Sequence, residues 1–124
     1  MRKVFTRFCV AGLLCTSLAC TPNLTGAWKI QFKRDSWDHF ESATCTISQR
    51  RHHVIVDCGD ETQFVSAKID GHHFMWQFKS GLNESIFATF SGELENGAKI
   101  ITGTWTFVDS SDNTSGRGTF QGTR

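Results

Sequence analysis

Several features that mark other protein classes are scarce or missing from this chain of 124 residues. It has no tyrosine and a single proline, which excludes a proline-rich linker. Its 13 Lys and Arg residues nearly balance 12 Asp and Glu residues, so a basic nucleic-acid-binding protein is not expected. Hydrophobic residues make up 39% of the chain, including 4 Trp and 11 Phe, which is too apolar for a disordered segment. The composition therefore indicates one small globular domain with an aromatic core.

Residues 1–19 have the pattern of a signal peptide. Arg2, Lys3 and Arg7 form a positively charged region, and an apolar run follows at residues 8–14. This run is too short to span a hydrocarbon core of ~30 Å, which needs about 20 residues. The order of charge, apolar run and small residues predicts that the segment is removed from the mature protein.

The signal peptide ends in Ser-Leu-Ala-Cys at residues 17–20, which resembles the lipobox of bacterial lipoproteins. That resemblance implies that Cys20 is lipidated and becomes the first residue of the mature chain, anchored to a membrane of the cell envelope. Thr21, in place of an aspartate, implies the outer membrane, facing the periplasm. The alternative is an ordinary secretory signal peptide. The expected organisation is a lipidated tether at residues 20–24 and a folded domain at 25–124.

Two cysteines are left for the folded domain. Cys9 and Cys15 leave with the signal peptide, and Cys20 would carry lipid, so Cys45 and Cys58 are expected to form a disulfide in an oxidising compartment. A metal–thiolate site would need further cysteines at short spacing, and the sequence contains none.

Apolar and polar residues alternate after residue 23 in short segments separated by turn sequences such as Asp70-Gly71 and Asn96-Gly97. This period of two predicts β-strands, and no segment has a long helical stripe. The eight expected strands are residues 25–34, 42–50, 52–58, 61–69, 72–79, 84–94, 98–108 and 115–123.

The cysteine pair predicts the register of one hairpin. If Cys45 faces Cys58, then Ile47 faces Val56 and Gln49 faces Val54, so apolar residues meet on one side of the sheet. The same alternation assigns an inward-facing set to the other strands. This set is Trp28, Ile30, Phe32, Val65, Ala67, Ile69, Phe74, Trp76, Phe78, Ile86, Ala88, Phe90, Ile101, Trp105 and Phe107.

Eight sequential antiparallel strands with one apolar face expose two sheet edges, which closure into a barrel removes. Gly26-x-Trp28 opens the first strand, and together with the up-and-down pattern it resembles the calycin group of small barrels, which includes the lipocalins and avidins. The resemblance implies that an arginine from the last strand covers the tryptophan, and Arg124 has the matching inward parity. We therefore expect a cation–π contact between Trp28 and Arg124. Avidin-like biotin binding is not supported, because tyrosine is absent.

The expected ligand site lies at the rim with the longer loops. An eight-stranded barrel is either filled by its own side chains or holds one small molecule. The many bulky inward residues predict a largely filled lumen, with a small cavity near this rim that binds a small apolar or aromatic group and no deep fatty-acid pocket. The candidate ligand-binding residues are Phe32, Trp37, Phe40, Phe78 and Phe107.

Other functions stay open at this stage. A protein-binding module resembling the lipocalin-like bacterial protease inhibitors is one alternative, and a structural envelope lipoprotein is another, so an envelope protein partner is possible. Enzymatic activity is not expected, because no catalytic motif is present and the His53 and Asp57 pair has outward parity. His52 and His72 share one rim but lack a third ligand, so neither a metal nor a cofactor is expected. The expected partners are the membrane, through the lipid anchor, and a small ligand.

Overall fold

The computed structural model describes residues 22–124, which form eight antiparallel strands in one sheet. Each predicted strand is present, with bounds shifted by at most two residues, and the predicted signal peptide and Cys20 lie outside the described part. No helix in residues 22–124 is long and apolar enough to cross a membrane. The elements are β2 (Gly26–Arg34), β3 (Glu41–Arg50), β4 (His53–Asp57), β5 (Thr62–Asp70), β6 (His73–Ser80), the short 3-10 helix η1 (Leu82–Glu84), β7 (Ile86–Glu95), β8 (Ile100–Asp109) and β9 (Thr114–Thr123).

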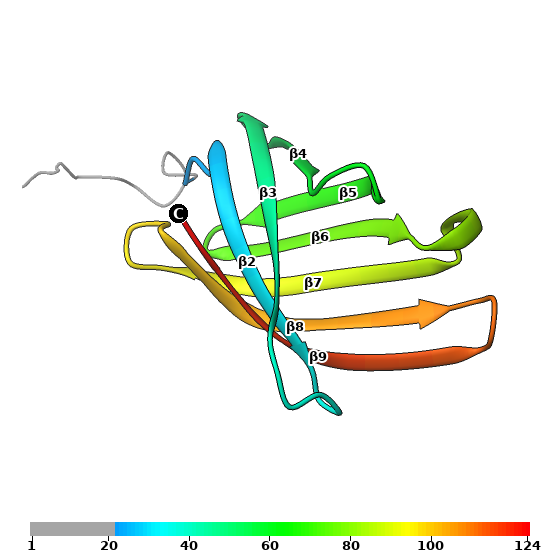
Figure 1. Ribbon diagram of the computed structural model, residues 1–124. Helices are drawn as coiled ribbons and strands as arrows, with labels where there is room; N and C mark the ends of the chain where they lie inside the picture. Colours follow the sequence, from blue (N-terminus) through cyan, green and yellow to red (C-terminus); the bar gives the residue numbers. More distant parts are fainter. Residues whose placement is uncertain (1–21) are drawn as a thin grey trace, which may run out of the picture.

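The strands follow one another around a nearly closed up-and-down barrel (Figure 1). The order in the sheet is β4-β3-β2-β9-β8-β7-β6-β5, so β2 and β9 pair and bring the two ends of the described chain together. β4 and β5 lie side by side, but no hydrogen-bonded ladder joins them. The all-β, eight-stranded barrel predicted from the alternation is confirmed, and it is consistent with a lipocalin-like fold.

The β3–β4 hairpin has the predicted register. Ile47 pairs with Val56 and Gln49 with Val54, and the strands are joined by a turn at residues 51–52. The disulfide between Cys45 and Cys58 is present, with a Cα–Cα distance of 4.1 Å. Alternation and a covalent bond thus indicate the same strand alignment.

The predicted inward orientation of one residue, Val65, is wrong. Its side chain is 42% exposed, because a β-bulge lies between Phe64 and Ser66. The extra residue changes the parity of β5, so that Phe64 faces Phe78 and packs against the core, while Ala67 and Ile69 face inward as predicted. A single bulge therefore exchanges Val65 for the larger Phe64 in the lumen.

The end of the barrel near the start of β2, here called the closed end, is sealed by residues that precede the first strand. Leu24 and Trp28 are fully buried, and the Trp28 indole N–H donates a hydrogen bond to the Leu24 carbonyl at 2.8 Å. Gln49 accepts a hydrogen bond from the Leu24 N–H at 2.8 Å and donates one to the Pro22 carbonyl at 2.9 Å. The expected tether at 20–24 therefore extends too far along the chain, because Leu24 belongs to the barrel core.

Arg124 follows β9 and lies over Trp28, with its guanidinium carbon 4.9 Å from the ring centroid. Its two terminal nitrogens also donate hydrogen bonds to the carbonyls of Thr25, at 3.0 Å, and Asn23, at 2.7 Å. In Figure 1 the chain end marked C accordingly lies beside the start of β2. The position over Trp28 is the one that the calycin resemblance implies, and the two carbonyl contacts add to it.

Candidate ligand-binding site

A cavity of about 1190 Å³ occupies the other half of the barrel and opens at its opposite end, here called the open end. Its walls reach from the loops of that end to Ile30, Cys45 and Phe90 in the middle of the strands. The cavity is therefore larger and deeper than the small, shallow one expected from the sequence. At the closed end, bulky side chains such as Trp28 and Phe74 are fully buried, as the count of bulky residues predicted.

The arrangement of the aromatic rings explains this space. Trp76, Phe90 and Trp105 are direct neighbours on β6, β7 and β8, and their rings stack with centroids 4.8 and 5.5 Å apart. Phe107 continues the row, 5.7 Å from Trp105. The stacked rings lie along the wall of the barrel, and Phe32 on β2 and Phe120 on β9 meet them edge-on. The space beyond these contacts, toward the open end, is the cavity.

Four of the five predicted ligand-binding residues line the cavity: Phe32, Trp37, Phe78 and Phe107. Phe40 does not, and it is 58% exposed beside a separate hollow on the outside of the barrel. Parity explains the difference, because Glu41 pairs with the inward-facing Phe32, and the residue before Glu41 therefore faces outward.

Arg34 lines the cavity and was missed as a site residue from the sequence. Its guanidinium carbon lies 4.5 Å from the Phe107 ring centroid and 5.5 Å from that of Trp37. The signal was present in the sequence, since Arg34 continues the inward parity of Trp28, Ile30 and Phe32. A charged side chain at the end of a strand is ordinarily expected to face solvent, whereas the Arg34 side chain extends over aromatic rings.

Gly116 on β9 leaves the space that Arg34 and Phe107 occupy. A Cβ atom at this position would lie 2.7 Å from Cε1 of Phe107 and 3.4 Å from Nη2 of Arg34. Neighbouring Gly118 faces the backbone of Lys33, with which a Cβ atom at this position would clash. The glycines of β9 thus allow close contact with β2 and room for two large side chains at the open end.

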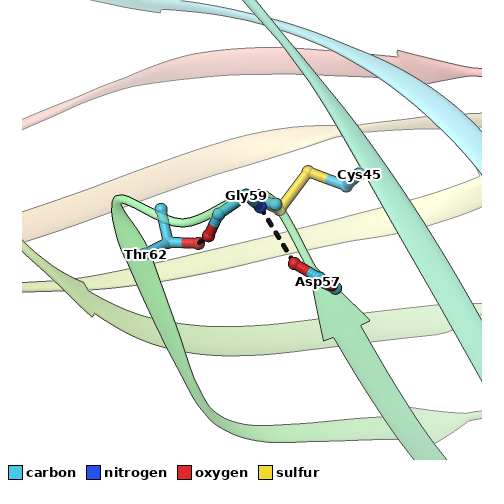
Figure 2. Close-up of a disulfide and its surroundings, with 5 residues drawn as sticks. Cys45, Asp57, Gly59 and Thr62 are labelled. Atoms are coloured by element: carbon cyan, nitrogen blue, oxygen red, sulfur yellow. Dashed lines mark hydrogen bonds between the residues drawn. A yellow bond between two sulfur atoms is a disulfide. The ribbon is translucent and has the colours of Figure 1, made fainter.

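The disulfide and the β4–β5 connection also line the cavity. Figure 2 shows the disulfide next to this connection. The Gly59 N–H donates a hydrogen bond to Oδ1 of Asp57 at 3.0 Å, and Oγ1 of Thr62 donates one to the Gly59 carbonyl at 3.1 Å. Gly59 has a φ of 108°, which favours glycine. These bonds hold the connection in place next to the half-buried Cys58.

The mouth of the cavity carries charges of both signs. Asp60, Glu61 and Glu84 contribute three negative charges to the lining, against the positive charges of Arg34 and Lys79. The net charge of these five side chains is therefore about −1 at neutral pH.

A deeper polar group, the indole N–H of Trp76, is buried and has no hydrogen-bond acceptor among residues 22–124. The corresponding N–H groups of Trp28 and Trp105 donate to the carbonyls of Leu24 and Thr119, at 2.8 and 3.2 Å. Trp76 is thus the buried donor that the strands themselves leave unsatisfied.

The turn between β8 and β9 also lies at the open end. The Ser110 N–H donates a hydrogen bond to the Ser85 carbonyl at 3.0 Å, which ties this turn to the start of β7. The pKa of Asp109 lies below its ordinary value, because the hydroxyl and the N–H of Ser111 donate hydrogen bonds to its carboxylate at 2.6 and 3.0 Å.

The histidines do not assemble a site. His52 and His72 are both exposed, and no three His, Cys, Asp or Glu side chains in residues 22–124 are arranged to hold a metal ion. His73 pairs with Glu93 on the outside of the barrel, with 2.7 Å between Nδ1 and Oε2. This pair lies on the solvent side of the sheet, away from the cavity.

Comparison of the chain with family models and with curated proteins finds no match to either. The function is therefore inferred from the residues and geometry of the barrel itself.

Proposed function

We propose that this protein is a membrane-anchored lipoprotein of the bacterial cell envelope whose barrel binds one small apolar or aromatic molecule without catalysis. The cavity of about 1190 Å³, open at one end and walled by stacked rings, is the observation that carries the proposal. Ligand sites in proteins are typically concave and mostly apolar, with a few polar groups near the ligand. The combination of aromatic walls with Arg34 and a mixed-charge mouth fits this description.

The packing of the segment before β2 at the closed end favours the ligand-binding function over the protease-inhibitor alternative. Such inhibitors act through a free, extended amino end, whereas Pro22 and Leu24 are hydrogen-bonded to Gln49 and Leu24 is fully buried. The segment just before β2 is therefore part of the barrel and is not available for insertion into another protein.

Binding is tested by titrating the full chain, reconstituted in lipid nanodiscs, with the neutral aromatic probe naphthaleneacetamide in a calorimeter. We expect saturable binding at one site per chain. Ala88 is 2% exposed and lines the cavity, so Ala88→Phe should fill the space and weaken binding at least tenfold. Thr106→Phe adds the same ring to an exposed position on β8 and should leave the affinity unchanged. No saturable binding in the wild type, or equal binding by both variants, would contradict the proposal.

The anchor is proposed to be Cys20. Only Thr21 separates it in sequence from Pro22, whose carbonyl is bonded to Gln49 at the closed end. A lipid on Cys20 would hold the closed end near the membrane and direct the open end toward the aqueous compartment. Cys20→Ser should abolish cleavage and acylation, whereas Cys15→Ser within the signal peptide should not. The anchor is refuted if processed Cys20→Ser protein still partitions into the detergent phase.

A further inference from the structure

Arg34 is the positively charged side chain that β2 directs into the barrel. It pairs with Gly118 in the same ladder in which inward-facing Phe32 pairs with Phe120. Arg34 is half-buried, and its guanidinium lies near the rings of Phe107 and Trp37 and beside Gly116. The charge therefore lies inside the mouth, above the row of stacked rings.

No protein group in residues 22–124 neutralises or accepts a hydrogen bond from this guanidinium. The nearest acidic residue in sequence, Asp35, pairs with Arg117 at 3.6 Å. At the start of β3, Glu41 contacts His39 at 3.2 Å. The carboxylates that share the cavity lining lie beyond ion-pair distance of Arg34. A guanidinium has five N–H donors, and ring faces occupy none of them.

This donor set is suited to a carboxylate. The planar fork of an arginine binds both oxygens of a carboxylate, and such charge-assisted bonds are stronger where apolar walls exclude water. The aromatic row below Arg34 would take the apolar part of the same molecule. The three acidic side chains at the mouth disfavour a polyanion, because the net charge of the lining is already about −1.

We propose that the ligand is an apolar monocarboxylate, with its carboxylate bound by Arg34 and its apolar body against Trp105 and Phe90. This inference rests on the proposed ligand-binding function and adds the chemical class of the ligand. Arg34 then determines specificity for the acid over a neutral molecule of the same shape.

The test uses naphthaleneacetate and naphthaleneacetamide, which share a ring and differ in charge. Both are titrated by calorimetry into the full chain in nanodiscs, with empty nanodiscs as the blank. We expect the acid to bind roughly 10-fold to 100-fold more tightly than the amide, as charge-assisted hydrogen bonds in an apolar site imply. Arg34→Gln should remove this preference and leave the affinity for the amide within about twofold of the wild type.

Lys29→Gln is the matched control. It removes the same charge from the same strand, but Lys29 faces outward and is exposed, so the preference for the acid should persist. Equal affinities for acid and amide in the wild type would overturn the assignment while leaving ligand binding itself intact. A preference that survives in Arg34→Gln would also overturn it. Absence of binding by both probes would refute this inference and the proposed function together.

Discussion

Arg124 holds the closed end through one ring contact and two carbonyl hydrogen bonds, and Arg124→Met tests what they contribute. Methionine keeps an apolar stem over Trp28 but has neither charge nor donors. The ring contact, at 4.9 Å and partly exposed, should contribute about 0.5–1 kcal/mol. The bonds to Thr25 and Asn23 should add roughly 0.5–1.5 kcal/mol each. The variant is therefore expected to lose roughly 1.5–4 kcal/mol of unfolding free energy.

Arg117→Met is the matched control on β9. Arg117 forms an exposed ion pair with Asp35 at 3.6 Å, which should contribute less than about 1 kcal/mol. Unfolding in urea, followed by tryptophan emission, compares both variants with the wild type at low and high salt. The loss in Arg124→Met should persist in high salt, because its acceptors are uncharged carbonyls, whereas the smaller loss in Arg117→Met should disappear. An Arg124→Met protein within about 0.5 kcal/mol of the wild type would refute the reasoning.

Two further predictions concern the hairpins. Removing the disulfide by replacing Cys45 and Cys58 with alanine should lower the unfolding free energy by about 3 kcal/mol, by the chain-entropy estimate for a loop of this length. The loss is measured from denaturant midpoints. Free thiols in the unreduced, unfolded wild-type protein would contradict the disulfide. Asp109 has a lowered pKa in the folded state, so its charge stabilises the fold above the unfolded-state pKa, and this contribution is lost as pH falls through the folded-state pKa. The stability difference between wild type and Asp109→Asn should therefore shrink on acidification, and a difference independent of pH would show that Ser111 does not favour the ionised carboxylate.

The strands were predictable because alternation, turns and the cysteine pair all indicate the same alignment. At Val65 the alternation predicts the wrong side-chain orientation. A bulge is a local change in backbone pairing, and the sequence around Val65 alternates equally well with or without it. Leu24 was assigned to a tether for a related reason, because a single apolar residue before the first strand has no period to reveal its burial.

The candidate site was predictable only in part. Parity would have identified Arg34 as inward-facing, because it continues the alternation of Phe32, and Phe40 as outward-facing, because it alternates with the inward-facing Cys45. The volume was not predictable by counting large residues. The sequence specifies that Trp76, Phe90 and Trp105 face inward, but it does not specify that their rings lie parallel along the wall.

The missing ladder between β4 and β5 gives the barrel mechanical compliance along one line. Separating any other pair of neighbouring strands breaks a row of backbone hydrogen bonds, whereas widening the barrel between β4 and β5 breaks none. The disulfide joins β3 to the residue that follows β4 and so keeps the two strands of that hairpin together when the barrel widens. Because the β4–β5 connection also lines the cavity, widening the barrel along this line would widen the mouth of the cavity while the other strands stay paired. A rigid molecule wider than the mouth in this structure could then enter.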